Sequence, residues 1–250
     1  ITEETTGFDL VRWQIMVAEG FPLTDMDVYP AGHAIEARIY AEEPSNNFQS
    51  SSGEILHWRE PAEVRVDSGI RDGDVISENY DPLLAKVTAY GEHRQGAIRR
   101  LDYALSKFHV LGVNSNIDFL RRILMHPEHL EGNVTTDFIM QHPELITDEL
   151  PIPVSVWIAA AIAKSQSSNI PTPLGHVSLH YFKHKQIGTH IALTAASPHT
   201  FTARISNQVF TVNVGYYQEG EMTLTVDNHR QKLAVLAGYQ NHWWVHLGNT

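Results

Sequence analysis

The sequence predicts an α+β protein in which a small antiparallel sheet with helices precedes a helix enclosed by a mostly antiparallel β-barrel. Three observations support this class. Alternating strand patterns gather between residues 33 and 90, and helix-period patterns follow between residues 93 and 141. After one helix that is apolar almost all round, short strand patterns fill the rest of the chain without intervening helices.

Composition narrows the class of protein before any motif is considered. The chain has 250 residues, enough for two modest domains, and its formal charge is −11 because 29 acidic residues face 18 Lys and Arg. This balance argues against nucleic acid and anionic membrane as partners. The absence of cysteine excludes disulfides and thiolate sites and suits an intracellular address. No apolar run approaches the ~20 residues of a membrane span. Because the chain begins at Ile1, we expect a piece of a longer protein.

The first element is predicted as one helix over residues 2–20. Thr6 would cap it while Asp9 reaches back, and Gly20 would end it. Glu3 and Glu4 are interpreted as favourable charges near a helix N-terminus rather than as catalytic groups.

Four strands are predicted next, over residues 33–42, 54–58, 63–68 and 83–90. In the first of them Glu36 and Arg38 share a face and are expected to pair, opposite an apolar face. Together the strands would form a small antiparallel sheet with one face free for a helix.

Three helices are predicted after the sheet. Residues 93–107 carry an apolar stripe, and a second helix begins near Asn116 and stops before Pro127. A short third one covers residues 136–141. Arg121 and Arg122 are interpreted as solvated helix charges.

Pro151 and Pro153 mark a linker, after which residues 154–163 form the apolar helix that something must enclose. Turn pairs are predicted at 206–207, 219–220, 228–229 and 240–241. Seven strands are expected around them, over residues 176–182, 189–194, 200–205, 208–214, 221–226, 232–236 and 243–247.

Common catalytic and metal-binding motifs are missing from the sequence. There is no phosphate-binding glycine loop, nucleophile elbow or His-Glu-x-x-His pair. His176, His180 and His184 recur every four residues, but on a strand they lie ~13 Å apart, too far to grip one ion, so we interpret them as surface histidines. No metal site is predicted. Trp157, Trp243 and Trp244 are expected as core and barrel-wall residues rather than as stacking platforms for a ligand.

Arg65 is the residue around which the functional interpretation is built. It alternates with Val64 and Val66 on a predicted strand, so a cation stands on an otherwise apolar element. Taken alone, the pattern favours a simple surface pair with Asp67.

Short motifs around Arg65 resemble the C-terminal subdomain of biotin carboxylase, an ATP-grasp enzyme. They fall in the family's order from Ile1 to about Gln141. They are Ile1-Thr2-Glu3-Glu4-Thr5-Thr6-Gly7-Phe8-Asp9-Leu10, Gly32-His33-Ala34-Ile35-Glu36-Ala37-Arg38-Ile39-Tyr40-Ala41-Glu42, Val64-Arg65-Val66-Asp67-Ser68-Gly69, Asn79-Tyr80-Asp81-Pro82-Leu83-Leu84-Ala85-Lys86-Val87 and Tyr90-Gly91-Glu92-His93-Arg94. Arg65, Asp67, Ser68, Tyr80 and Asp81 stay in register with the family, whereas Ser50-Ser51-Ser52-Gly53 replaces its usual Pro-Ser-Pro-Gly.

The resemblance implies a chemistry. The family uses ATP and magnesium to convert bicarbonate into carboxyphosphate and then carboxylates N1 of biotin. The arginine matched by Arg65 faces the biotin ureido group, so the resemblance makes Arg65 catalytic and biotin-binding. The family's ATP-binding lysines and magnesium-binding glutamates correspond to positions before Ile1. We therefore expect a ligase when full length, and an inactive chain of 250 residues.

Further motifs are Asn116-Ile117-Asp118-Phe119-Leu120, His126-Pro127 and Thr136-Asp137-Phe138-Ile139, followed by a helix and a strand-rich tail. With this tail from about Gln141 onward, the pattern resembles a narrower group, the alpha subunits of biotin-dependent acyl-CoA carboxylases, and most of all 3-methylcrotonyl-CoA carboxylase. The resemblance implies a biotin carboxylase subdomain over 1–142, a linker over 143–152 and a barrel over 153–250 that joins the carboxyltransferase beta subunit. A biotin carboxyl carrier domain, a hetero-oligomer, and a bacterial cytoplasmic or mitochondrial matrix location are further expectations. The alternative is a non-catalytic assembly module that docks the carboxyltransferase. The acyl-CoA itself cannot be read from these residues.

Overall fold

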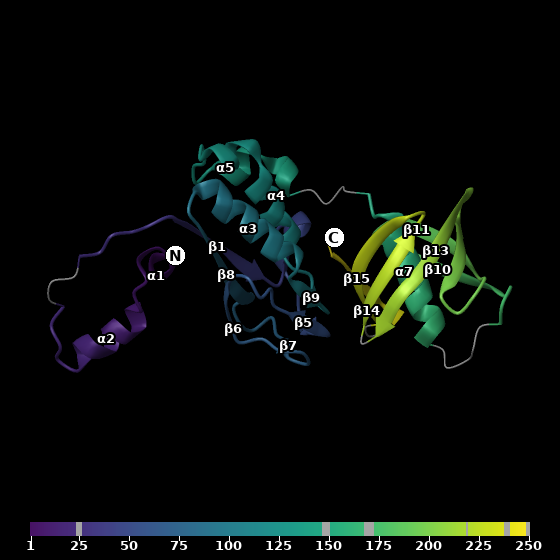
Figure 1. The fold of residues 1–250 in the computed structure, drawn as a ribbon, viewed down its shortest axis with the longest axis horizontal. Coiled ribbons are helices and arrows are strands. Elements are labelled where there is room, and N and C mark those ends of the chain that lie inside the picture. The colour runs from purple at the N-terminus through teal and green to yellow at the C-terminus, as the bar shows by residue number, and fades with distance from the viewer. Residues whose placement is uncertain (24–26, 147–150, 168–172, 219, 238–240, 249–250) are drawn as a thin grey trace. The chain divides into compact units, whose positions relative to one another are not determined.

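Contacts divide the computed structural model of the chain into two compact units. The first unit comprises residues 1–54, 58–108 and 113–148, and the second comprises residues 55–57, 109–112 and 149–250. The structure describes residues 1–23, 27–146, 151–167, 173–218, 220–237 and 241–248 (Figure 1). Within this part of the chain, no helix is long and apolar enough to cross a membrane.

The N-terminal residues form two helices, so the prediction of one continuous helix is wrong. Helix α1 spans Thr2–Thr6 and helix α2 spans Leu10–Ala18. Gly7 separates them with a φ of 74°, a left-handed conformation that glycine adopts without a steric penalty. The cap of α2 is Asp9, whose side chain accepts a hydrogen bond from the Arg12 amide at 2.9 Å, whereas the Thr6 hydroxyl donates back to the Thr2 carbonyl.

A three-stranded antiparallel sheet forms the centre of the first unit. Strands β1 (His33–Tyr40), β8 (Leu83–Gly91) and β6 (Arg65–Ser68) lie in the order β1-β8-β6. One face is apolar, as the alternation predicts, and Ile39 and Val87 on it are fully buried. Helix α3 (Arg94–Ser106) packs on the sheet through the predicted stripe, and its buried apolar residues are Ala97, Ile98, Leu101, Ala104 and Leu105.

Shorter elements complete the chain up to residue 145, and residues 109–111 among them fall in the second unit. The strand predicted over 54–58 is divided: β4 (Gly53–Glu54) pairs with β7 (Val75–Ile76), and β5 (His57–Arg59) pairs with β9 (His109–Leu111). The remaining elements are β2 (Glu42–Glu43), η1 (Pro44–Asn46), β3 (Gln49–Ser50), α4 (Ile117–Met125), α5 (Pro127–Glu131), α6 (Phe138–Gln141) and η2 (Pro143–Leu145).

Polar side chains of α4 and its N-terminus bond to other elements of the first unit, instead of capping the helix or pointing into solvent. The Asn116 side chain accepts from the Tyr40 amide at 2.9 Å and donates to the Arg38 carbonyl at 3.1 Å, so it anchors α4 to β1 instead of capping the helix. Arg121 pairs with Asp102 of α3 at 2.8 Å, and Arg122 donates to the Leu145 carbonyl at 2.9 Å. The prediction of two solvated arginines is therefore wrong.

Gly91 sets how closely α3 approaches β8. A Cβ added there would lie 2.4 Å from the Ala97 nitrogen, whereas a Cβ at Gly96 would meet nothing within 4 Å. We expect Gly91→Ala to destabilise the first unit by about 1–3 kcal/mol, because backbone atoms must shift to admit the methyl group. Gly96→Ala is the matched control and is expected to stabilise α3 by up to about 1 kcal/mol. Urea unfolding measures both, and equal midpoints for the two variants would contradict the prediction.

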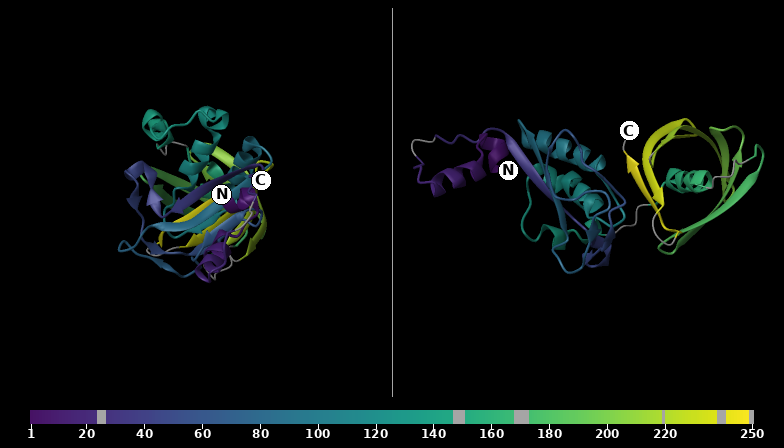
Figure 2. Two further views of the ribbon diagram at one scale, coloured as in Figure 1. Left: turned by 90° about the vertical axis from the view of Figure 1, so that its left-hand side faces the viewer. Right: turned by 90° about the horizontal axis from the view of Figure 1, so that it is seen from below.

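The second unit is a helix surrounded by one curled sheet, as predicted. Helix α7 (Val154–Ser167) lies inside seven antiparallel strands joined in chain order, and Figure 2 shows the sheet curling around it. All seven predicted strands are present. They are β10 (Val177–His184), β11 (Ile187–Ala195), β12 (Thr200–Ile205), β13 (Gln208–Gln218), β14 (Glu221–Val226), β15 (His229–Ala237) and β16 (Trp243–Gly248).

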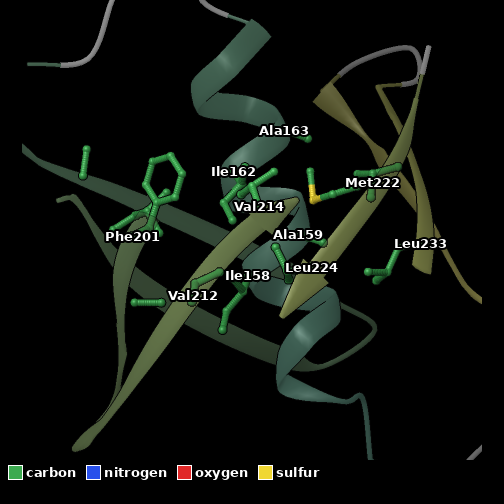
Figure 3. Close-up of a cluster of buried hydrophobic side chains, with 14 residues drawn as sticks. Ile158, Ala159, Ile162, Ala163, Phe201, Val212, Val214, Met222, Leu224 and Leu233 are labelled. Carbon is green, nitrogen blue, oxygen red and sulfur yellow. The ribbon is translucent and has the colours of Figure 1, made fainter. Parts of the chain in front are cut away.

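The core of this unit lies between α7 and the inner face of the sheet (Figure 3). Ile158, Ile162, Val212, Met222 and Leu224 are all fully buried there. A helix that is apolar almost all round thus finds apolar strand residues around it, which is the physical reason for the enclosure. Other members of the same cluster are Ala159, Ala163, Leu193, Ala195, Phe201, Ala203, Val214, Leu233 and Val235.

Turn residues fix the registers between these strands. The predicted turn at 206–207 is confirmed, since Ile205 pairs with Gln208. The turn predicted at 228–229 is displaced by one residue, because Val226 pairs with His229 and leaves a two-residue loop. Asp227 and Asn228 in that loop have φ values of 45° and 71°, which are the positive values that a type I′ turn requires. The turns predicted at 219–220 and 240–241 lie partly outside the described residues.

Candidate functional site

The polar face of the three-stranded sheet carries the candidate site. Thr88 of β8 is the register partner of both Glu36 and Arg65, so these side chains form one row across the sheet. Lys86 is likewise the partner of both Arg38 and Asp67, which form the next row on the same face. Two rows of charged and hydroxyl groups thus lie opposite the face that α3 covers.

Arg65 is held by carboxylates from two parts of the chain. Its Nε donates to Asp67 Oδ2 at 3.0 Å, which is the surface pair that the strand pattern favoured. Its Nη1 lies 2.5 Å from Glu3 Oε2 of α1 and 3.8 Å from Glu4 Oε1. The side chain remains 39% exposed, so the guanidinium is oriented by its neighbours and still accessible from solvent.

Hydrogen bonds favour the ionised forms of Glu3 and Arg65. Hydrogen bonding to Arg65, supported by the bond from the Leu10 amide, lowers the pKa of Glu3. Hydrogen bonds from Glu3 and Asp67 raise the pKa of Arg65 further above its ordinary range. The site therefore presents a permanent cation whose direction is set by two carboxylates.

Three other residues in register with the family have local roles. The Ser68 hydroxyl donates to the Leu84 carbonyl at 3.2 Å and accepts from the Ile70 amide at 3.1 Å. Asp81 accepts from the Leu83 amide at 2.8 Å, and Tyr80 is 82% exposed. Among the described residues, no bond joins Ser68, Tyr80 or Asp81 to Arg65. The structure brings only Asp67 of this set to the guanidinium.

Glu3 is the member of the site that the sequence interpretation missed. The sequence analysis made it a helix-terminus charge, but its two oxygens contact Arg65 and the Leu10 amide. No local pattern could reveal a pair separated by 62 residues. The available signal was Gly7, because a break in the helix there is what leaves Glu3 next to the start of α2.

The histidines at four-residue intervals do not converge. In the described part of the chain, His176, His180 and His184 do not belong to any group with metal-ligand spacing. His180 differs from the predicted surface histidine, because its Nε2 lies 3.0 Å from the hydroxyl of Ser165 on α7 and 3.0 Å from that of Ser178. It joins the inner face of β10 to the enclosed helix.

His180 should make the second unit sensitive to acid. Burial first, and then the nearby Lys164 ammonium, lower the pKa of His180. A folded-state pKa below the unfolded value means that the associated stability is present above about pH 6.5 and is lost as the pH falls through the folded pKa. We expect the unfolding midpoint of wild type to fall between about pH 6.5 and pH 5. His180→Gln should flatten that slope, and an unchanged slope would contradict the assignment.

Comparison with known proteins finds a family similarity within the first part of the chain. Residues 36–141 match the family model described as the biotin carboxylase C-terminal domain. Arg65, Asp67 and the whole three-stranded sheet except the first residues of β1 lie inside the match. Residues 36–141 are therefore similar to a biotin carboxylase C-terminal domain.

Relatives of this region are subunits of biotin-dependent carboxylases that are much longer than this chain. Over 147 residues the chain is 45% identical to the methylcrotonoyl-CoA carboxylase alpha subunit of Mus musculus. The aligned region covers 57% of this chain and 20% of that protein. Over 145 residues it is 39% identical to the propionyl-CoA carboxylase alpha chain of the same species, covering 56% and 20%. The chain thus spans about a fifth of the length of these relatives.

A solved structure supports the fold of the domain. The biotin carboxylase domain of Hydrogenobacter thermophilus 2-oxoglutarate carboxylase, a dimer in complex with MgADP, ADP and bicarbonate, is 31% identical with a TM-score of 0.58. The superposition covers 60% of this chain and 34% of the solved chain. The predicted α+β class and the predicted biotin carboxylase fold are therefore confirmed.

Proposed function

We propose that the chain is part of the alpha subunit of a biotin-dependent acyl-CoA carboxylase, in which the intact protein carboxylates biotin with ATP and bicarbonate. The observation that carries this proposal is Arg65, an accessible guanidinium held by Glu3 and Asp67 on the polar face of a biotin carboxylase domain. A permanent cation aimed by two carboxylates is suited to stabilise oxyanion charge as it develops.

The residues present fit a biotin ureido oxygen. An arginine offers five N–H donors, and the bonds to Glu3 and Asp67 engage only the Nε and Nη1 nitrogens. When bound, biotin would supply the nitrogen that is carboxylated. Arg65 would hold the ureido oxygen, while Glu3 and Asp67 keep the guanidinium plane in place. We assign binding of ATP and magnesium to parts of the relatives that this chain does not span.

The names of the relatives also support a proposal for the acyl-CoA substrate and the cellular location of the intact enzyme. The methylcrotonoyl-CoA carboxylase relative has higher identity than the propionyl-CoA carboxylase relative, so we propose methylcrotonoyl-CoA as the acceptor in the intact enzyme. Both relatives are named mitochondrial, which supports the mitochondrial matrix over bacterial cytoplasm.

The proposal is tested with the full-length subunit. ADP release should require both bicarbonate and free biotin, and a biotin carboxyl carrier domain should replace free biotin at lower concentration. ADP release that is independent of biotin would contradict the proposal. The 250-residue chain serves as the negative control, since we expect no turnover from it.

A second function, docking of a carboxyltransferase beta subunit, is favoured by the outer face of β10. Val177, Leu179 and Tyr181 alternate with half-buried residues on this strand and are 51%, 81% and 53% exposed. Three large apolar groups in a row on an edge strand form a surface suited to a protein partner. The second unit would then attach the biotin carboxylase to the subunit that uses carboxybiotin.

Leu179→Asp tests this surface. We expect the substitution to weaken co-purification of the carboxyltransferase beta subunit by at least about tenfold, because a charge replaces an apolar contact at the centre of the row. Val209→Asp is the matched control, since Val209 of β13 is 55% exposed but lies on another strand. Equal retention of the beta subunit by both variants and wild type would contradict docking through β10.

A further inference from the structure

A cluster of imidazole and carboxylate groups lies away from Arg65, where two helical segments of the first unit meet. His126 stands between α4 and α5, His142 follows α6, and Glu144 lies in η2. The two imidazole rings are 4.3 Å apart between centroids. Phe138 packs against both rings, at 5.2 Å and 4.7 Å, so an apolar side chain covers one side of the cluster.

The donor atoms of the cluster converge on one position. One ligand atom each from His126, His142 and Glu144 lies within 4.8 Å of the other two. The Nδ1 atom of His126 is buried and has no hydrogen-bond partner among the described residues, although an unsatisfied buried nitrogen costs about 1–3 kcal/mol. A ligand that accepts the lone pair of this nitrogen would remove that cost.

Carboxylates already hold His142 in place. Its Nδ1 lies 3.0 Å from Glu144 Oε1 and its Nε2 lies 3.3 Å from Glu128 Oε2. The His142 side chain is only 17% exposed, whereas that of Glu144 is 62% exposed and can adjust. One face of the cluster is thus preorganised and another is open to an ion from solvent.

We propose that His126, His142 and Glu144 bind a Zn²⁺ ion that joins the α4–α5 segment to the α6–η2 segment. Two imidazole nitrogens and one carboxylate oxygen form a borderline donor set that favours Zn²⁺ over Mg²⁺. With ligand bonds of about 2.0–2.1 Å, ligand atoms of a tetrahedral site lie roughly 3.4 Å apart, so the cluster must contract by about 1.4 Å at most. The exposed Glu144 side chain can rotate toward the two imidazoles, and water would occupy the fourth position.

Zinc titration of the 250-residue chain tests the site. Calorimetry should detect Zn²⁺ binding by wild type that depends on His142 and Glu144, with no comparable binding of Mg²⁺, and Co²⁺ should give the visible absorption of a tetrahedral complex. His142→Gln and Glu144→Gln should each weaken this binding at least about tenfold, since even the loss of a second-shell partner costs about 10–100-fold. Glu131→Gln is the matched control, because Glu131 is an exposed carboxylate nearby that bonds Asn133.

The chain has fifteen histidines, so the difference between variants is the decisive quantity. Metal-free melting curves identify any variant that has lost its fold. Zn²⁺ should raise the melting temperature of wild type and Glu131→Gln by several degrees and leave that of Glu144→Gln unchanged. Equal zinc affinity in wild type, His142→Gln and Glu144→Gln would overturn the proposal. Because the cluster does not include Arg65, this result is independent of biotin carboxylation.

Discussion

Arg65→Ala in the full-length subunit is expected to lower the rate of biotin carboxylation about 100- to 1000-fold. The substitution removes the cation that would stabilise the developing oxyanion, and it leaves Glu3 and Asp67 without their shared partner. Bicarbonate- and ATP-dependent carboxylation of free biotin measures the effect. The fold should persist, because the side chain is 39% exposed and lies on the polar face of the sheet.

Two variants separate the geometry of Arg65 from its charge. Arg65→Lys retains the charge but not the planar fork, so we expect it to recover only a small part of the activity.

Arg99→Ala is the control for the loss of an arginine elsewhere. It removes an exposed arginine from α3 and should leave the rate of biotin carboxylation within about twofold of wild type. Full activity in Arg65→Ala would contradict a catalytic role and leave the surface-pair interpretation.

Ile162→Asp is expected to prevent folding of the second unit. Ile162 is fully buried on α7 inside the curled sheet, where a carboxylate would have neither solvent nor a cationic partner among the core residues around it. The cost exceeds about 4–5 kcal/mol, which is a large part of the stability of a domain. Far-UV circular dichroism and the fluorescence of Trp157 should both show the loss.

Matched substitutions on the same helix show that burial causes the effect. Gln166→Asp adds the same charge at an exposed position of α7 and should cost only a few tenths of a kcal/mol. Ile162→Val removes one methylene and should cost about 0.5–1.5 kcal/mol. A cooperative transition in Ile162→Asp close to that of wild type would show that the sheet does not enclose the helix in solution.

Elements with a strong hydrophobic period could be predicted from the sequence. The stripe of α3 and the alternation of β1 identify their buried faces correctly, because burial of an amphipathic face depends mainly on spacing along the chain. The apolar helix and the seven strand patterns after it predict an enclosed helix for the same reason. The ordered motifs around Arg65 also identify the family of residues 36–141 correctly.

Contacts between distant residues could not be predicted in this way. Gly7 divides one periodic segment into two helices, and Asn116 bonds β1 instead of capping α4, since a polar group binds whichever partner folding brings near. The turn at Asp227 and Asn228 lies one residue before the predicted position, because Val226 pairs with His229.

Sequence alone therefore determined the α+β class, the apolar faces and the family resemblance of the motifs around Arg65, all of which depend on local spacing and ordered motifs. Only the tertiary structure decided that Glu3 meets Arg65 across 62 residues and that His126, His142 and Glu144 converge. Ion pairs and metal coordination require atoms to lie within a few ångströms of one another in space. The spacing of residues along the chain does not give that distance, so these contacts could not be predicted from the sequence.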